Sequence, residues 1–166
     1  MKPLIIKNGF FILLLLTMGT RCVKDENIKN SDFVIGYIVG SFRCWEIDSV
    51  TGYMINNKTP RGYCILLEGS ANANSHWPMD YYTFNLPAEL FDFPEEILRD
   101  LNGYECSPYF FPDSYRNKYK IGFKYRLLNE KEKVNFVCGG CLALGAGFPW
   151  ENYKEISLDL ESMIKY

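Results

Sequence analysis

Residues 32–45 read Asp-Phe-Val-Ile-Gly-Tyr-Ile-Val-Gly-Ser-Phe-Arg-Cys-Trp and carry the strongest fold signal in the chain. They are rich in β-branched and aromatic residues, which fit a pleated, half-buried surface, so they predict a long β-strand. Gly36 and Gly40 lie inside this strand, and glycines in such positions mark bulges or sharp bends. We therefore expect a strand that curls round a small barrel.

Other segments of the chain predict strands by the same criterion, and turn-rich sequence separates them. These segments are residues 61–68, 80–85, 119–128 and 133–138. Residues 48–60 contain Gly52, Asn56, Asn57 and Pro60, and they predict a hairpin loop after the first strand.

The pattern changes between the third and fourth predicted strands. Residues 87–91 predict a helical turn, and residues 94–101 predict a short helix. Pro94 suits a first helical position, and Glu95 and Glu96 match the positive end of the helix dipole. The sequence therefore predicts three strands, one short helix and then two strands.

This order resembles that of the OB-fold, a five-stranded, partly open barrel. The resemblance is architectural and covers residues 32 to about 138, because no sequence motif marks this fold. It implies a mainly β chain that forms a small, five-stranded antiparallel barrel with one short helix between strands 3 and 4. A calycin-like or other small antiparallel barrel stays open as an alternative.

The C-terminal segment fits two periodicities. Ile156, Leu158 and Leu160 alternate as in a strand, whereas Ile156, Leu160 and Ile164 also share one face of a helix. We favour a strand that is added to the barrel edge.

The N-terminus reads as a secretory signal. A basic start at Lys2 and Lys7 precedes the apolar run 10–16, and small residues then lead to Cys22. The run is too short to cross roughly 30 Å of hydrocarbon, which needs about 20 residues. The order resembles a bacterial lipoprotein signal, and that resemblance implies that Cys22 is lipidated and begins the mature protein.

Arg21 departs from the lipoprotein pattern, in which a small residue usually precedes the cysteine. Cleavage without lipidation, or an uncleaved stub in the inner membrane, therefore stays open. The tract Lys24-Asp25-Glu26 resembles the Lys-acid-acid tract of surface-exported lipoproteins in one Gram-negative group. The alternative interpretation is that these polar residues form a solvated tether, and that the anchored protein faces the periplasm.

These signals divide the chain into a signal peptide (1–21), a polar tether (22–31) and one β-barrel domain (32–166). The signal peptide holds three basic residues and no acidic one, so the mature chain has 20 acidic residues against about 15 basic ones. Nucleic-acid binders depend on basic neutralisation of phosphates, so this balance disfavours a nucleic-acid partner. It also disfavours adhesion to anionic lipid through a basic patch.

Cysteines offer the main chemical signal in the chain. Cys44 and Cys64 lie in adjacent predicted strands, which makes a cross-strand disulfide one interpretation. Cys138-Gly-Gly-Cys141 fits a structural disulfide at a turn or a redox-active C-x-x-C pair. We favour the structural disulfide, because neither a helix nor a βαβ unit is predicted around the pair. A zinc site would need further ligands nearby, so no metal is predicted.

The sequence predicts no catalytic residue and no cofactor. His76 is the sole histidine, and no motif places a nucleophile or carboxylate beside it. The aromatic run after residue 104 is the candidate binding surface, although a cap over one barrel end is the favoured interpretation. Its candidate ligand contacts are Tyr109, Phe110, Phe111 and Tyr115.

The leading hypothesis is a lipid-anchored, non-enzymatic binding or assembly module of the bacterial cell envelope. Its expected location is the outer membrane, facing either the periplasm or the cell surface, with an envelope protein or glycan as partner. One alternative is an extracytoplasmic thiol-disulfide protein that uses Cys138 and Cys141. A purely structural envelope component is the other.

Lipidation of Cys22 is tested by intact mass spectrometry of the chain extracted from membranes. We expect a mature chain that begins at Cys22 and carries a diacyl or triacyl adduct. A mature mass without lipid, or one that begins elsewhere, would contradict the expectation.

Overall fold

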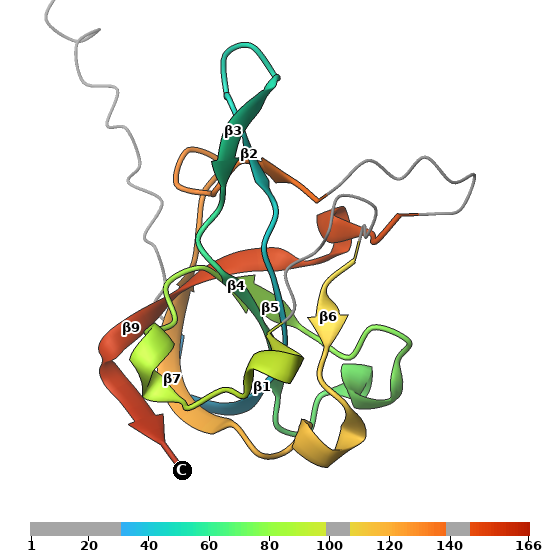
Figure 1. The fold of residues 1–166 in the computed structure, drawn as a ribbon. Coiled ribbons are helices and arrows are strands. Elements are labelled where there is room, and N and C mark those ends of the chain that lie inside the picture. Colours follow the sequence, from blue (N-terminus) through green and yellow to red (C-terminus); the bar gives the residue numbers. More distant parts are fainter. Residues whose placement is uncertain (1–30, 99–106, 139–146) are drawn as a thin grey trace, which may run out of the picture.

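The computed structural model describes residues 31–98, 107–138 and 147–166, and these residues are almost entirely strands and loops (Figure 1). The strands are β1 (Val34–Phe42), β2 (Trp45–Ile47), β3 (Met54–Lys58), β4 (Gly62–Leu67), β5 (Tyr81–Thr83), β6 (Tyr109–Phe110), β7 (Lys120–Leu127), β8 (Phe136–Val137) and β9 (Lys154–Lys165). Among the described residues, no helix is long and apolar enough to cross a membrane.

Five strands close into a barrel in the order β1-β4-β5-β9-β7, with β7 pairing back to β1. Closure depends on β1, whose first half pairs with β7 and whose later part pairs with β4. The β1–β4 register shifts between Ile38 and Gly40, so the bend predicted from the glycines is present. A Cβ on Gly40 would lie 2.8 Å from the carbonyl oxygen of Tyr109, because β6 pairs with β1 at this point.

The barrel is mixed rather than wholly antiparallel. β5 and β9 run parallel, with Tyr81 opposite Lys154 and Tyr82 opposite Glu155, whereas the other barrel pairs are antiparallel. The prediction of a mainly β, five-stranded barrel is thus confirmed, and the prediction that all of its strands are antiparallel is wrong. The physical reason is the long β9, which bends past β7 and reaches the free edge of β5.

The fifth barrel strand is also not the predicted one. The C-terminal segment is a strand, as favoured from its alternation, but it completes the barrel instead of extending an edge. Ile156 and Leu158 point into the barrel core and are buried. Of residues 133–138, only Phe136–Val137 form a strand, and they pair with β2 outside the barrel.

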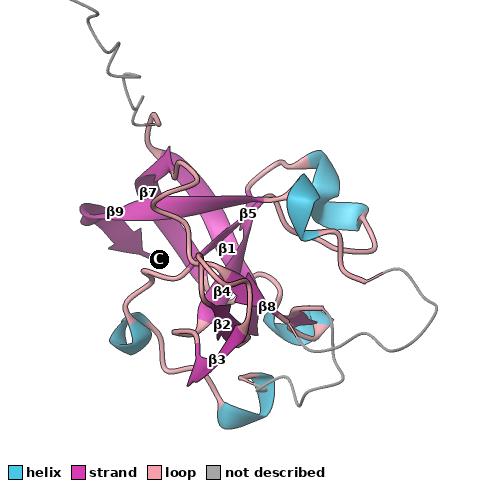
Figure 2. Ribbon diagram, turned by 90° about the horizontal axis from the view of Figure 1, so that it is seen from above, coloured by secondary structure: helices cyan, strands magenta, loops and turns pink. Residues whose placement is uncertain are grey.

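The prediction of a short helix between strands 3 and 4 is wrong for residues 94–98. The described part of this segment ends at Leu98. Two single 3-10 turns, Ala88–Leu90 and Glu95–Ile97, stand in its place. Phe91 and Phe93, on the extended chain between these turns, are both buried against the barrel. A short helix is marginal alone, and burial of these two rings favours the extended backbone that orients them. In Figure 2 the helical turns lie around the periphery of the strands.

A second sheet stands beside the barrel, with the strand order β3-β2-β8. Residues 48–60, predicted as a hairpin loop, contain the strand β3, which pairs with β2. The β2–β3 hairpin projects from the barrel at the top of Figure 1. The small sheet joins the connection between β1 and β4 to the connection between β7 and β9, since β8 belongs to the latter.

The barrel strands bury side chains on both faces, which explains the high apolar content of β1 and β4. Inside the barrel, Ile38 of β1 packs in a cluster with Ile65, Ile121 and Phe123. The opposite face of the same strands forms a second cluster, under the small sheet and its connections. That cluster includes Val39, Phe42, Cys44, Cys64, Leu66, Met79, Tyr82, Cys138 and Phe148.

Gly62 and Gly122 give a matched test of this packing. A Cβ on Gly62 would overlap the ring of Phe42, which is fully buried among other rings. A Cβ on Gly122 would meet the ring of Phe33, which is 42% exposed and free to turn away. We expect Gly62→Ala to lower the free energy of unfolding by about 1–3 kcal/mol, as overpacking does, and Gly122→Ala to cost clearly less. Urea unfolding of both variants measures the difference, and equal losses would contradict this account.

Candidate binding pocket beside the barrel

A pocket of about 650 Å³ lies beside the second core, between two described parts of the β7–β9 connection (128–138 and 147–153) and the strands β5 and β9. Its volume falls in the range of about 300–1,000 Å³ that is usual for small-molecule sites. The lining combines aromatic rings with charged and amide side chains, so it offers both stacking surfaces and hydrogen-bonding groups.

Aromatic rings form the wall of the pocket nearest the barrel. Phe136, Trp150 and Tyr153 are half-buried, whereas Tyr82 and Phe148 are buried. The ring centroids of Phe148 and Tyr153 lie 5.2 Å apart in a stacked arrangement. Phe136 and Trp150 meet edge to face at 5.0 Å. Such contacts add about 0.5–1.5 kcal/mol per pair beyond burial, so this wall is rigid.

Phe42 connects the wall to the barrel. Its ring lies 4.6 Å from Trp150 and 5.7 Å from Phe136, centroid to centroid, and it is fully buried at the end of β1. The barrel therefore fixes the position of the rings that face the pocket.

Charged and amide side chains also line the pocket. Lys154, Glu151 and Asn135 are exposed, and Lys133 forms an ion pair with Glu130. Both signs of charge are present, so the pocket suits a ligand with several hydrogen-bonding groups better than a purely apolar one.

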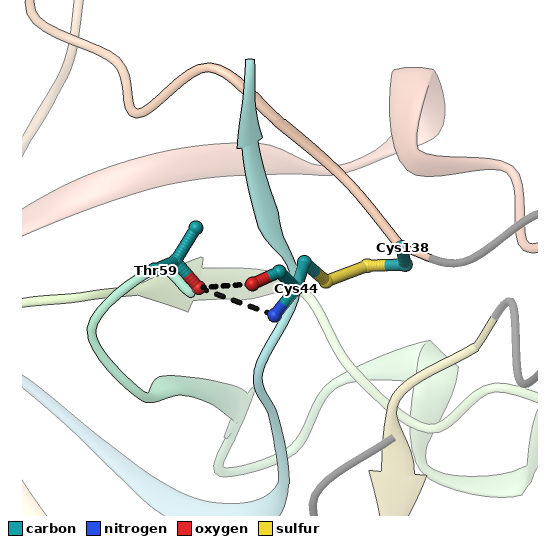
Figure 3. Close-up of a disulfide and its surroundings, with 3 residues drawn as sticks. All are labelled: Cys44, Thr59 and Cys138. Atoms are coloured by element: carbon teal, nitrogen blue, oxygen red, sulfur yellow. Dashed lines mark hydrogen bonds between the residues drawn. A yellow bond between two sulfur atoms is a disulfide. The ribbon is translucent and has the colours of Figure 1, made fainter. Parts of the chain in front are cut away.

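A disulfide between Cys44 and Cys138 ties the two connections together (Figure 3). The two cysteines are 94 residues apart in sequence, and their Cα atoms are 4.5 Å apart. Thr59 also helps to hold Cys44 in place, because its buried hydroxyl accepts a hydrogen bond of 3.2 Å from the Cys44 amide. Cys138 itself lines the pocket, so the disulfide fixes one edge of the site.

Neither predicted cysteine pairing is formed in this structure. A Cys44–Cys64 disulfide is wrong, because Cys64 lies opposite Gly40, and four residues of extended chain, roughly 13 Å, separate that point from Cys44. A disulfide between Cys138 and Cys141 is also wrong here, since the Cys138 sulfur is bonded to Cys44. Cys22, Cys106 and Cys141 lie outside the described residues.

Cys64 is a free, fully buried thiol. Burial raises its pKa well above the ordinary range, which leaves it in the unreactive thiol form. The described cysteines therefore present a structural disulfide and an inert thiol.

Glu155 lies next to the pocket, hydrogen-bonded to the lining residue Val134, and sequence reasoning missed it. Glu155 is 2% exposed. Its carboxylate accepts a hydrogen bond of 3.1 Å from the backbone amide of Val134, a residue of the connection between β7 and β9. Burial raises its pKa to about 7, although the Val134 hydrogen bond and the charge of Lys133 act in the other direction. Alternation along β9 places Glu155 on the outer face, where sequence alone predicts a solvated acid. Only the overlying connection buries it.

The predicted aromatic contacts are not among the residues that line this pocket. Phe111 is buried in the barrel core, which leaves its ring no surface for a ligand, and Tyr115 stacks on Tyr119. Tyr109 packs against the barrel core, whereas Phe110 packs against the second core beside Phe148. Three of the four predicted contacts therefore pack against the barrel core.

His76 is exposed on a loop beside Trp77. Within residues 31–98, 107–138 and 147–166, no group of three metal-ligating side chains comes together.

No family model matches the chain, and neither the curated proteins nor the solved structures contain a match to it. The function is therefore argued from the pocket itself. The pocket's described side chains offer ring stacking, hydrogen bonds and charges of both signs, which is the chemistry of noncovalent recognition.

Glu155 predicts a pH dependence of stability. The folded chain holds a proton on Glu155 more tightly than the unfolded chain, whose carboxyl has the ordinary pKa of 4.5. The free energy of unfolding should therefore fall by about 1–3 kcal/mol as the pH rises from 4.5 to 7. Glu155→Gln keeps a side-chain oxygen that can accept the Val134 hydrogen bond. Because glutamine does not titrate, this variant should lose the decrease in unfolding free energy that Glu155 causes between pH 4.5 and 7. Urea unfolding at a series of pH values measures it.

Glu151→Gln is the matched control, because Glu151 is an acid four positions before Glu155 that is exposed to solvent. Its pH profile should follow that of the parent chain. If Glu155→Gln also keeps the parent profile, Glu155 does not hold its proton as described.

Proposed function

We propose that this chain is a lipid-anchored, non-enzymatic binding module of the bacterial cell envelope, and that its pocket beside the barrel binds an envelope glycan. The pocket carries the proposal, because half-buried rings and exposed polar side chains line the same space. The anchor is the predicted lipid on Cys22, and the predicted location is the outer membrane.

The proposal includes an OB-fold-like architecture for the barrel. β1, β4, β5, β7 and β9 serve as strands 1 to 5, and the barrel order is then 1-2-3-5-4. OB-folds bind oligosaccharides and oligonucleotides through the face of strands 2 and 3 and through the connections 1–2 and 4–5. Here the pocket lies on the connection 4–5 and on strand 3, and the Cys44–Cys138 disulfide joins the two connections. This placement supports a ligand at the pocket.

The pocket's chemistry favours a glycan over a nucleic acid. Trp150, Phe136 and Tyr153 offer ring surfaces for the apolar faces of sugar rings, and Asn135, Glu151 and Lys154 offer partners for hydroxyl groups. Nucleic acids require a net excess of basic groups along the phosphate path. Glu130, Glu151 and the net negative charge of the mature chain oppose such a ligand.

Lys154→Ala and Lys124→Ala test the pocket. Both lysines are exposed and lie on barrel strands, but only Lys154 lines the pocket. On a glycan array followed by calorimetry, we expect Lys154→Ala to raise the Kd of the best-bound glycan about tenfold, the loss of one hydrogen-bonding partner. Lys124→Ala should leave the Kd unchanged within a factor of about two.

Two results would contradict the proposal. One is the absence of glycan binding by the parent chain across an array of envelope saccharides. The other is an equal loss of affinity in both lysine variants, which would place the ligand outside the pocket.

A further inference from the structure

The β2–β3 hairpin exposes an unusual amount of apolar surface. Val50, Tyr53, Met54 and Ile55 are 91%, 77%, 64% and 39% exposed. They follow one another within the tip and the start of β3, on the part of the molecule that projects furthest from the barrel in Figure 1. Grouped exposed apolar residues of this kind mark a contact with a partner or a membrane.

The backbone amides at the turn of the tip have hydrogen-bond partners within the turn. The carboxylate of Asp48 accepts hydrogen bonds from the amides of Val50 and Thr51 at 2.9 and 2.7 Å. The Gly52 amide donates to the Asp48 carbonyl at 2.9 Å, and the Asp48 amide donates to the Tyr53 carbonyl at 2.9 Å. Gly52 allows this turn because its φ is +71°.

The paired turn favours a lipid surface as the occupant of the tip. The amides of Val50, Thr51 and Gly52 already have partners, so they lose little on leaving water, whereas an unpaired amide would be costly near hydrocarbon. β3 is an edge strand in the order β3-β2-β8, so pairing with a strand of another chain is the competing mode of contact.

The charge of the tip also fits a neutral lipid surface. Residues 49–57 contain no charged side chain, and two charges flank them. Asp48 faces the amides of its own turn, and the Lys58 ammonium lies over the Trp45 ring at the base of the hairpin, 5.8 Å from its centroid. Tyr53 has the amphipathic ring that is enriched at membrane interfaces. The Asp48 charge limits entry to the level of the headgroups.

The hairpin is held firmly at its base. Trp45 pairs with Lys58 of β3 and with Val137 of β8, and the Cys44–Cys138 disulfide lies next to this pairing. A contact at the tip would therefore fix the orientation of the barrel and its pocket.

The predicted anchor would keep the domain close to a bilayer. Ser31 is bound to β7 through hydrogen bonds with Tyr125 of 2.7 and 2.8 Å. Eight residues lie between Cys22 and Ser31, so a lipid on Cys22 would hold Ser31 within about 30 Å of the membrane. We propose that the hairpin tip, from Val50 to Ile55, inserts at the headgroup boundary of that membrane as a second contact. The proposal rests on the proposed lipid anchor.

The test reads the depth of the tip in vesicles. The full chain, extracted from membranes, is reconstituted into phosphatidylcholine vesicles with or without brominated acyl chains, and bound chain is separated by flotation. Tyr53→Trp adds a fluorophore at the tip. Ile164→Trp is the matched control, because Ile164 is 49% exposed and close to the C-terminus, which Figure 1 places far from the hairpin. After subtraction of the parent emission, brominated lipid should quench the added emission of Tyr53→Trp about twofold and leave that of Ile164→Trp unchanged.

Mass spectrometry of Cys22 separates the two proposals. A chain that floats, carries lipid on Cys22 and shows no quenching at residue 53 overturns the hairpin contact and leaves the anchor standing. An unmodified Cys22 with quenching at residue 53 overturns the anchor alone, and a chain that does not float overturns both. A shift of the Tyr53→Trp emission with protein concentration, without quenching, would identify a second copy of the chain as the occupant and overturn the membrane contact.

Discussion

The pairing of β1 with two strands is the constraint on which the rest of the structure depends. Residues Val34 to Tyr37 pair with β7, and residues from Gly36 onwards pair with β4, so one strand belongs to both sides of the barrel. The strand can do this because it bends at a bulge near Gly40. Every other barrel pairing follows from this closure, including the parallel contact that lets β9 fill the gap between β5 and β7.

A closed barrel with both strand faces buried needs cover on the outside, and the two long connections provide it. Phe42, at the end of β1, anchors the rings of Trp150 and Phe136 against the outer face. The Cys44–Cys138 disulfide and the β2–β8 pairing then hold the connections to each other. The pocket lies on this outer layer, so its position depends on contacts between residues nearly a hundred positions apart in the chain.

The outer layer also gathers the features that bear on function. The pocket, the buried Glu155 and the apolar hairpin tip all belong to it, whereas the interior of the barrel is filled by side chains. If the hairpin meets the membrane as proposed, the pocket takes a fixed orientation above that surface, because β8 joins the hairpin to the connection that lines the pocket. Recognition and anchoring would then depend on one rigid sheet.

The sequence by itself determined the mainly β class, the bend in β1, the positions of most barrel strands and the excess of acidic over basic residues. These follow from local composition, alternation and glycines, which act through near neighbours. Tertiary structure alone decided that Cys44 pairs with Cys138, that β9 completes the barrel and that Glu155 is buried. It also replaced the predicted helix with turns that bury Phe91 and Phe93. Each of these outcomes depends on which distant segment covers a given face, and alternation within one strand does not specify that partner.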